Sequence, residues 1–307
     1  MYALSPGPGM AVSRHLVHKS AHAEVLLTGW LAVDDTFIVT AQWPRGHGFY
    51  HPRRGFHDPL LFAETVRQAL SLLSHEAFDV PLDHQLVWKD LSFHVLPDAL
   101  RVGPQPLEVR LVVTCVEAVR RRGMLAAACM RMTAWADGSA LGHAHTRYSA
   151  HSPGVYRRLR AGRHDTAAAR ANALPPAEGV PPEKVARHLP GDVVLSPTRH
   201  LRTWQLRVDL DHPILFDHPV DHVPGMLLLE AARQAAITSH PAGCTIVTSM
   251  TTRFHRYLEL DRPVWLTLTS DSSDLLNVRV EQDHVTCFEA AVGTTRQQRA
   301  SLPRQPV

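Results

Sequence analysis

The chain lacks the features that would place it in a membrane or a secretory pathway. It contains no run of about 18 apolar residues, which argues against a transmembrane helix. Residues 1–22 hold no apolar core of signal-peptide length. The cysteines form no CxxC pair, so we expect no structural zinc and instead free thiols in the cytoplasm. They are Cys115, Cys129, Cys244 and Cys287.

Motifs for nucleophilic, metal and nucleic-acid chemistry are missing as well. There is no GxSxG, and no cysteine has a matched base. His218 and His222 lie in a proline-bracketed loop, and His143 and His145 lack a third ligand, so no metal site is expected. The net charge of +3 is weakly basic, and its dense positive stretches (Arg120–Arg122, Arg157–Arg163) have no aromatic interleaving. No recognised DNA-binding pattern supports a nucleic-acid partner, and an acidic protein would suit the same charges equally well.

The sequence repeats itself in order along the chain. At 307 residues with 45% apolar and 20% charged residues, it has room for two globular domains. EVLLTG at 24–29 matches DVVLSP at 192–197, and FYHP at 49–52 matches FDHP at 216–219. ETVRQAL at 64–70 matches EAARQAA at 230–236, and SFHV at 92–95 matches RFHR at 253–256. The offset drifts only from 168 to 161, which indicates a tandem duplication.

Each repeat has the pattern of an α+β unit. One long apolar helix is expected at about Pro59–Leu73 and at about Gly225–Thr238, and alternating β-branched stretches follow it. The expected strands are 107–119, 124–137, 264–270, 275–282 and 285–293, with turns at RRRG and DGSALG. An antiparallel sheet wrapped around one helix is therefore predicted for each half. The domains are predicted at 1–155 and 186–307, joined by a linker at 156–185 that is rich in Arg, Ala, Pro and Gly.

A polar stripe interrupts the second of these helices. Glu230, Arg233 and Gln234 lie at i, i+3 and i+4, so they share one face of an otherwise apolar helix. The same stripe recurs in the first half as Glu64, Arg67 and Gln68. A solvent-facing ion pair would explain it, but a surrounding sheet would desolvate the stripe, and a buried unpaired charge costs several kcal/mol. We therefore expect paired, partly buried charges with a functional purpose.

The start of the same helix offers a second ingredient of a site. Pro224–Gly225 begins it, where free N–H groups and the helix dipole can stabilise an oxyanion, and glycine allows close approach. Glu230 follows about one and a half turns later and suits proton transfer. The loop residues His218, Asp221 and His222 lie just upstream and are expected to complete this site, with loop hydrogen bonding as the alternative.

These residues resemble a known signature. His218-x6-Gly225-Met226-x3-Glu230-Ala-x2-Gln234 is similar to the loop and helix of hotdog-fold dehydratases that act on acyl carrier protein thioesters, although the loop is shorter here. A closer resemblance is to the A-factor biosynthesis hotdog family. It is carried by DHPVDHVPGM and LLEAARQA, by VHK at 17–19 and EVLLTGW at 24–30, and by the duplication. The resemblance spans nearly the whole chain and implies a tandem double hotdog.

The resemblance also implies an activity. Such proteins move a β-ketoacyl group from acyl carrier protein to the primary hydroxyl of dihydroxyacetone phosphate, and the ester closes to a butenolide phosphate. That product leads to γ-butyrolactone or furan signals controlling secondary metabolism. No cofactor is implied, and a homodimer is left open. The family's catalytic residues fall on Glu64, Glu230 and Arg233, and Arg67 is added by the repeat.

The expected mechanism assigns roles to these residues. The N–H groups of Gly225 and Met226 would polarise the thioester carbonyl, and Glu230 would take the acceptor's hydroxyl proton. Arg233 would orient Glu230 or bind the phosphate, with Arg253 and Arg256 as other phosphate ligands. Gln234 belongs to the same stripe. Replacing Glu230 by Gln is expected to abolish ester formation and leave the fold intact. The alternatives are a hotdog thioesterase or dehydratase and a non-catalytic binder of acyl groups or lactones.

Overall fold

The computed structural model describes residues 12–240, 245–270 and 275–296. The strands are β1 (Leu27–Val33), β2 (Thr36–Trp43), β3 (Gln85–Val95), β4 (Leu107–Arg121), β5 (Met124–Ala136), β6 (Ser139–His151), β7 (Leu195–Pro197), β8 (Thr203–Leu206), β9 (Thr245–Phe254), β10 (Trp265–Ser270), β11 (Leu275–Gln282) and β12 (Val285–Arg296). The α-helices are α1 (Leu60–Glu76), α2 (Pro153–Leu159), α3 (Thr166–Ala171) and α4 (Gly225–Thr238). Short 3-10 helices lie at Arg14–Val17, His22–Glu24, Pro97–Leu100, Pro182–Val185 and Pro190–Asp192.

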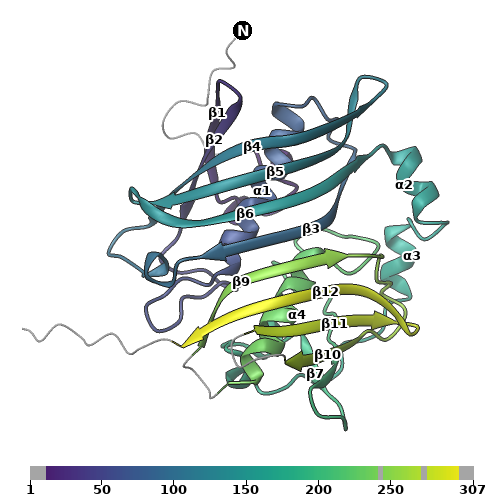
Figure 1. The fold of residues 1–307 in the computed structure, drawn as a ribbon. Coiled ribbons are helices and arrows are strands. Elements are labelled where there is room, and N and C mark those ends of the chain that lie inside the picture. The colour runs from purple at the N-terminus through teal and green to yellow at the C-terminus, as the bar shows by residue number, and fades with distance from the viewer. Residues whose placement is uncertain (1–11, 241–244, 271–274, 297–307) are drawn as a thin grey trace, which may run out of the picture.

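All twelve strands form one sheet, in the order β1-β2-β4-β5-β6-β3-β9-β12-β11-β10-β8-β7. Neighbouring strands pair antiparallel, and β3 pairs with β9 to join the two halves. Read outward from that junction, the two halves have the same strand order, so the duplication seen in the sequence is also present in the topology. Helices α1 and α4 lie side by side against one face of this sheet (Figure 1).

The long helices are buried because their sequences are apolar on nearly every side. In α1 only Arg67 and Glu76 are not buried, and in α4 the stretch Met226–Ile237 is buried throughout. A helix of this kind is stable only when protein surrounds it. The predicted bounds of α4 are confirmed. Helix α1 starts one residue after the predicted Pro59 and continues one turn beyond Leu73, to Glu76.

The hairpins form where the sequence predicts turns. Arg122 and Gly123 connect β4 to β5 with φ of 52° and 82°, and Asp137 and Gly138 connect β5 to β6 with φ of 46° and 80°. Two consecutive positive φ values are typical of the tight turn that matches strand twist. Strand β6 begins at Ser139, so only the first two residues of DGSALG turn. The expected strands are confirmed, with small shifts at their ends.

The connection between the halves has structure of its own. Helices α2 and α3 and the 3-10 helix Pro182–Val185 lie in or beside the predicted linker 156–185. The domain boundaries at 155 and 186 stay a prediction. In the described part of the chain, no helix is long and apolar enough to cross a membrane.

Candidate active site

Glu230 lies at the centre of a fully buried network of charges. Its carboxylate accepts hydrogen bonds from Arg233 Nε and Nη2 at 2.8 and 2.7 Å, and from Gln234 Nε2 at 2.5 Å. Arg187 adds two more, from Nε at 2.8 Å and from Nη2 at 2.5 Å. The exposed fraction is 0% for Glu230 and 5% for each arginine. The stripe on α4 is therefore a buried ion-pair network and not a solvent-facing edge.

Arg187 ties this network to the first half of the chain. Its Nη1 donates to Asp58 Oδ2 and to the carbonyl of Phe49, both at 2.8 Å. Its guanidinium also lies over the ring of Phe49, 4.2 Å from the ring centre. Arg187 was not predicted from the sequence. The repeat carries a signal for it, because VHK at 17–19 lies 168 positions before VAR at 185–187, the same offset as the first repeated block.

The first half contains an equivalent network around Glu64. Arg67 donates from Nε and Nη2 at 2.9 and 2.8 Å, and Gln68 Nε2 donates at 2.8 Å. Lys19 Nζ, the counterpart of Arg187, lies 3.2 Å from Glu64 Oε1. Arg67 and Arg233 each donate to a valine carbonyl, at Val17 and Val185 respectively. The duplication therefore preserves the whole network and not only the helix stripe.

The charges around each glutamate decide its protonation state. Burial would raise the pKa of Glu230, but the charges and hydrogen bonds of Arg187 and Arg233 outweigh burial and lower that pKa to about 2. For Glu64, Arg67 and Lys19 likewise outweigh burial and lower the pKa to about 2. A general base works best with a pKa near the operating pH. In this arrangement Glu230 is a weak base with its oxygens engaged, so it is suited to holding arginines in place.

The loop before α4 makes its polar contacts with residues other than Glu230. Asp217 crosses to the first half, where its carboxylate accepts from the backbone N–H groups of Ser20 and Ala21 at 2.5 and 3.0 Å. The next residue, His218, lies near Arg67 and Lys19, and burial followed by the charge of Arg67 lowers its pKa. His218 therefore belongs to the surroundings of the Glu64 network.

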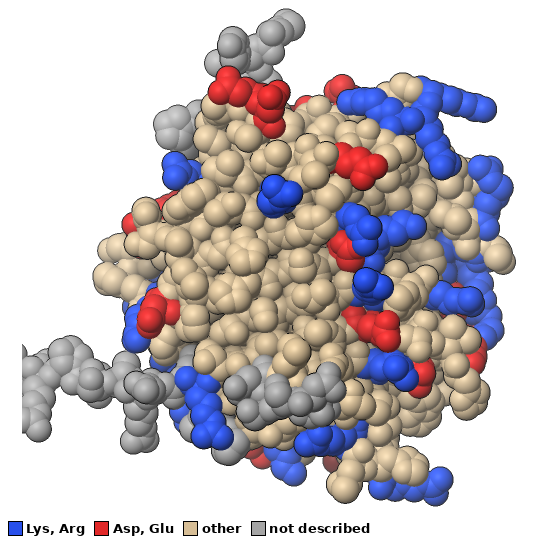
Figure 2. Space-filling view, in the orientation of Figure 1, with Lys and Arg blue, Asp and Glu red and all other residues tan. Residues whose placement is uncertain are grey.

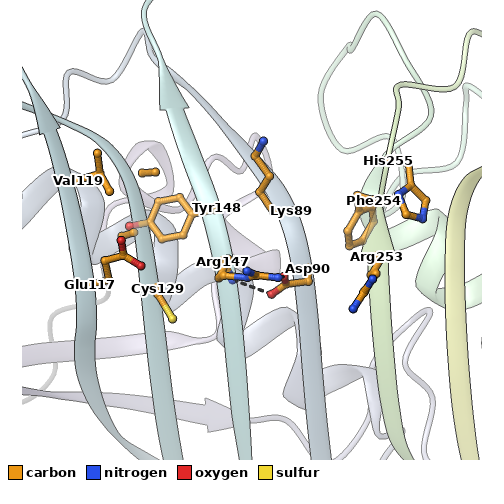
Figure 3. Close-up of a pocket in the computed structure, with 12 residues that line it drawn as sticks. Lys89, Asp90, Glu117, Val119, Cys129, Arg147, Tyr148, Arg253, Phe254 and His255 are labelled. Carbon is orange, nitrogen blue, oxygen red and sulfur yellow. Dashed lines mark hydrogen bonds and ion pairs between the residues drawn. The ribbon is translucent and has the colours of Figure 1, made fainter.

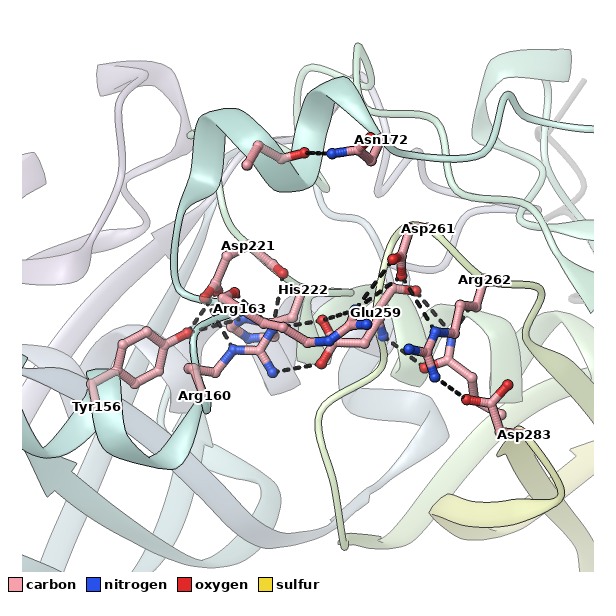
Figure 4. Close-up of polar contacts among 12 residues, drawn as sticks. Tyr156, Arg160, Arg163, Asn172, Asp221, His222, Glu259, Asp261, Arg262 and Asp283 are labelled. Atoms are coloured by element: carbon pink, nitrogen blue, oxygen red, sulfur yellow. Dashed lines mark hydrogen bonds and ion pairs between the residues drawn. The ribbon is translucent and has the colours of Figure 1, made fainter.

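Asp221 and His222 belong to a separate polar cluster that ties α2 to this loop (Figure 4). The Tyr156 hydroxyl donates to Asp221 Oδ1 at 2.6 Å, and His222 Nδ1 lies 2.6 Å from the same oxygen. Arg160 Nε donates to Asp221 Oδ2 at 3.0 Å and bridges to Glu259. These contacts fix the segment after β6 against the second half. Neither Asp221 nor His222 makes a hydrogen bond or ion pair with Glu230.

The N-terminus of α4 lacks a side-chain cap but is covered. Pro224 precedes the helix and provides no capping hydrogen bond. A Cβ at Gly225 would lie 3.0 Å from the ring of Trp88 and 3.5 Å from that of Phe254. Both rings lie against this glycine, and the neighbouring Met226 is buried. The predicted approach of a substrate to Gly225 stays a prediction. By contrast, a side chain satisfies part of the N-terminus of α1, where Asp58 Oδ1 accepts from the N–H of Leu60 at 2.9 Å.

An open pocket lies between the halves, next to Arg233. Its lining comes from the first-half loop before α1, from α4 and from the start of β9. It includes His51, Arg53, Arg54, His57, Asp58, Arg233 and Thr245. Through Arg233 the Glu230 network reaches a cavity that the two halves build together. Arg233 was predicted from the sequence but none of the first-half residues was, since no local pattern shows that one repeat's loop reaches the other's helix.

A larger cleft of about 460 Å³ lies over the β3–β9 junction (Figure 3). Arg253 lines it, with Lys89, Glu117 and the ion pair between Arg147 and Asp90. The predicted phosphate ligand Arg253 therefore lines a different cavity from Arg233.

Figure 2 shows that Lys and Arg side chains gather along the margin of this face, over the strand ends near α2 and α3.

One cysteine has a histidine partner that the sequence did not reveal. Cys129 Sγ lies 3.1 Å from His145 Nε2 on neighbouring strands. Burial raises the pKa of the Cys129 thiol, which opposes thiolate formation. His143 stacks on His94 at 5.4 Å between ring centres. Among the described residues, no group of three or more His, Cys, Asp or Glu could hold a metal ion. Cys244 lies outside the described residues.

Comparison with known proteins places this geometry in context. The family model described as the A-factor biosynthesis hotdog domain matches residues 5–152 and 168–295. A 2-oxo-3-(phosphooxy)propyl 3-oxoalkanoate synthase of Streptomyces virginiae is 43% identical over 289 residues, covering 92% of this chain and 97% of the relative. A synthase of the same name from Streptomyces griseus is 37% identical over 298 residues, covering 93% and 96%.

A solved structure supports the fold alone. An acyl-ACP thioesterase from Bacteroides thetaiotaomicron VPI-5482 superimposes with a TM-score of 0.51 at 12% identity, covering 84% of this chain and 98% of that one. Together with the family match, this confirms the predicted tandem hotdog architecture, in which each sheet half packs on one long helix.

Proposed function

Because the chain belongs to the A-factor biosynthesis hotdog family, we propose that it is a synthase that joins a 3-oxoacyl group to dihydroxyacetone phosphate. The name of its relatives describes the product as an ester of a 3-oxoalkanoate with a 2-oxo-3-(phosphooxy)propyl group. That group is what dihydroxyacetone phosphate contributes when its free hydroxyl is esterified. The alignment covers 97% of the Streptomyces virginiae synthase, so the likeness extends over both repeats and is not limited to one of them.

The proposed donor is a 3-oxoacyl thioester of acyl carrier protein, in the cytoplasm. The acceptor's hydroxyl oxygen attacks the thioester carbonyl, the new C–O bond forms and the C–S bond breaks. The hydroxyl proton leaves with the released thiol. The ester then closes by intramolecular condensation between its activated methylene and the ketone, which loses water and gives a butenolide phosphate. None of these steps requires a redox cofactor.

One structural observation supports this function most directly. The buried Glu230–Arg187–Arg233 network reaches, through Arg233, a pocket formed by both halves of the chain. We assign Glu230 the role of a positioning residue, because its pKa of about 2 and its five hydrogen bonds suit it to fixing two guanidinium groups. Arg233 then presents positive charge to an anionic substrate or a developing oxyanion. Glu64 and Arg67 would do the same for the first half.

The experiment is a product analysis with and without acceptor. Purified protein is incubated with a 3-oxoacyl thioester of acyl carrier protein, and products are identified by mass spectrometry. An ester that forms only when dihydroxyacetone phosphate is present is the expected result. Free 3-oxo acid in equal amount with or without acceptor would identify a thioesterase and overturn the proposal. The variant Arg45→Gln serves as the control for handling and folding, because Arg45 is exposed and lines neither pocket.

A further inference from the structure

The pocket between the halves has a chemistry of its own. We propose that it is the subsite for the acceptor's phosphate group, with Arg53, Arg233, His57 and Thr245 as its ligands. This inference rests on the proposed function in one respect, namely that the acceptor is a phosphate ester. Nothing in the comparison with relatives assigns such a subsite. Four observations support it: charge, unused hydrogen-bonding groups, size and asymmetry between the repeats.

The first observation is an excess of positive charge. Three arginines line the pocket, Arg53, Arg54 and Arg233, against one carboxylate, Asp58. Arg233 pairs with Glu230, and Asp58 pairs with Arg187 at 2.8 Å, so these four charges balance and Arg53 brings a charge that they do not neutralise. Burial, and then the charges of Arg233, Arg54 and Arg187, lower the pKa of Arg53. An anion in the pocket would relieve this repulsion, and guanidinium groups are well suited to a phosphate.

The second observation is a pair of buried polar groups with no use in the described part of the chain. His57 is 1% exposed, and neither ring nitrogen has a hydrogen-bond partner there. Thr245 Oγ1 is buried and likewise has no partner among the described residues. Buried polar atoms in native proteins are nearly always hydrogen-bonded, and a phosphate oxygen would supply the acceptor that the described residues do not provide. Burial lowers the pKa of His57, so the neutral ring offers one N–H donor.

The third observation is size. The cavity measures about 50 Å³, space for roughly four water molecules at about 10–15 Å³ each. A phosphate group fills such a space, whereas an acyl chain does not. The cleft over the β3–β9 junction measures about 460 Å³ and carries the carboxylates Asp90 and Glu117 among its cations. This cleft is much larger than a phosphate group, and its two carboxylates offset part of its positive charge.

The fourth observation is that the duplication provides this subsite only once. The loop FYHPRRGFHDP at 49–59 corresponds to FDHPVDHVPG at 216–225, which is one residue shorter. His51 aligns with His218, so Arg53 and Arg54 align with Val220 and Asp221. Counted back from the helices, His57 aligns with Val223. The second-half loop thus lacks the cations and the buried imidazole, and of the two equivalent networks only that of Glu230 borders this pocket, through Arg233.

The test compares acceptors with and without phosphate. For wild-type protein, KM is measured for dihydroxyacetone phosphate and for dihydroxyacetone. In Arg53→Gln we expect KM for the phosphate ester to rise at least tenfold, with little change in KM for dihydroxyacetone. Arg53→Lys should recover part of the loss, because it keeps the charge. Arg45→Gln, which removes an exposed arginine outside the pocket, should match wild type for both acceptors.

A binding experiment separates this inference from the proposed function. Titration calorimetry with dihydroxyacetone phosphate and with inorganic phosphate needs no turnover, so it reports on the pocket even if no ester is made. We expect both ligands to bind wild type and Arg45→Gln, and to bind Arg53→Gln at least tenfold more weakly. Equal binding by Arg53→Gln, or loss of binding in Arg253→Gln instead, would overturn the inference. Absence of ester with retained, Arg53-dependent phosphate binding would overturn the proposed function alone.

Discussion

Removing the charge of Glu230 should destabilise the protein strongly, contrary to the expectation from sequence that Glu230→Gln leaves the fold intact. Glutamine offers one acceptor oxygen and places an NH₂ group among five donors. Arg233 then loses its buried carboxylate partner, and Arg187 keeps only Asp58. Breaking one partner of a buried ion pair costs about 3–5 kcal/mol. For a unit of this size the melting temperature falls by about 2–4 °C per kcal/mol, so we expect a decrease of roughly 6 °C or more.

Urea unfolding followed by circular dichroism measures the loss in free energy of unfolding, with Glu64→Gln as the matched control. The side chain of Arg67 is 19% exposed, against 6% for Arg233 and 2% for Arg187, so water compensates more of the loss in the first half. Glu64→Gln should therefore lose less free energy of unfolding than Glu230→Gln. Equal midpoints for Glu230→Gln and wild type would refute the reasoning.

A double-mutant cycle tests the same network directly. Arg187→Gln leaves Asp58 without its buried cation, and Glu230→Gln leaves Arg187 without its main anion. When both are replaced, Arg233 and Asp58 still carry opposite charges. The double variant should be more stable than the sum of the single losses predicts, by about 1–3 kcal/mol. Strict additivity would show that these groups do not interact in solution.

The contacts of other residues predict three more outcomes. The pKa of Glu64 and of Glu230 is lowered from 4.5 to about 2 on folding. Each carboxylate should therefore contribute its full stabilisation above about pH 4.5, and the free energy of unfolding should fall by roughly 3 kcal/mol per carboxylate as the pH drops to 2. Urea titrations at several pH values measure it, and a flat profile would contradict it. Gly225→Ala should lower the free energy of unfolding by about 1–3 kcal/mol, because its Cβ meets the ring of Trp88 at 3.0 Å; an unchanged urea midpoint would argue against that contact. Cys129 should react slowly with iodoacetamide at pH 7 in the folded protein, since burial raises its thiol pKa, and peptide mass spectrometry can quantify the label. Rapid labelling of native protein would instead indicate a thiolate activated by His145.

The sequence predicted those parts of the fold that depend on local periodicity. The bounds of α4 and the turns at Arg122–Gly123 and Asp137–Gly138 are set by residue patterns within a few positions. The β3–β9 junction is not, because no local pattern states which strand of one repeat pairs with which strand of the other. The same holds for Gly225, whose neighbour Trp88 is distant in sequence.

Prediction of the site divided in the same way. The pairing of Glu230 with Arg233 was predictable because their spacing puts them on one helix face. The third member, Arg187, lies outside the helix and could be found only by extending the repeat to VHK at 17–19. The exchange of loops between halves was not predictable. It moves His218 to the Glu64 network and brings Arg53 and His57 towards Arg233.

The exchanged loops have a consequence for how such a protein can change over time. In a symmetric dimer of one shorter chain, every substitution would appear in both sites at once. Here the two copies are joined, so Arg53 can arise in one loop while Val220 stays in the other. The loop before each long helix nevertheless contacts the other half of the chain, so substitutions in one half remain constrained by the other. In a fused chain the two loops can therefore acquire different residues while each half still depends on contacts with the other.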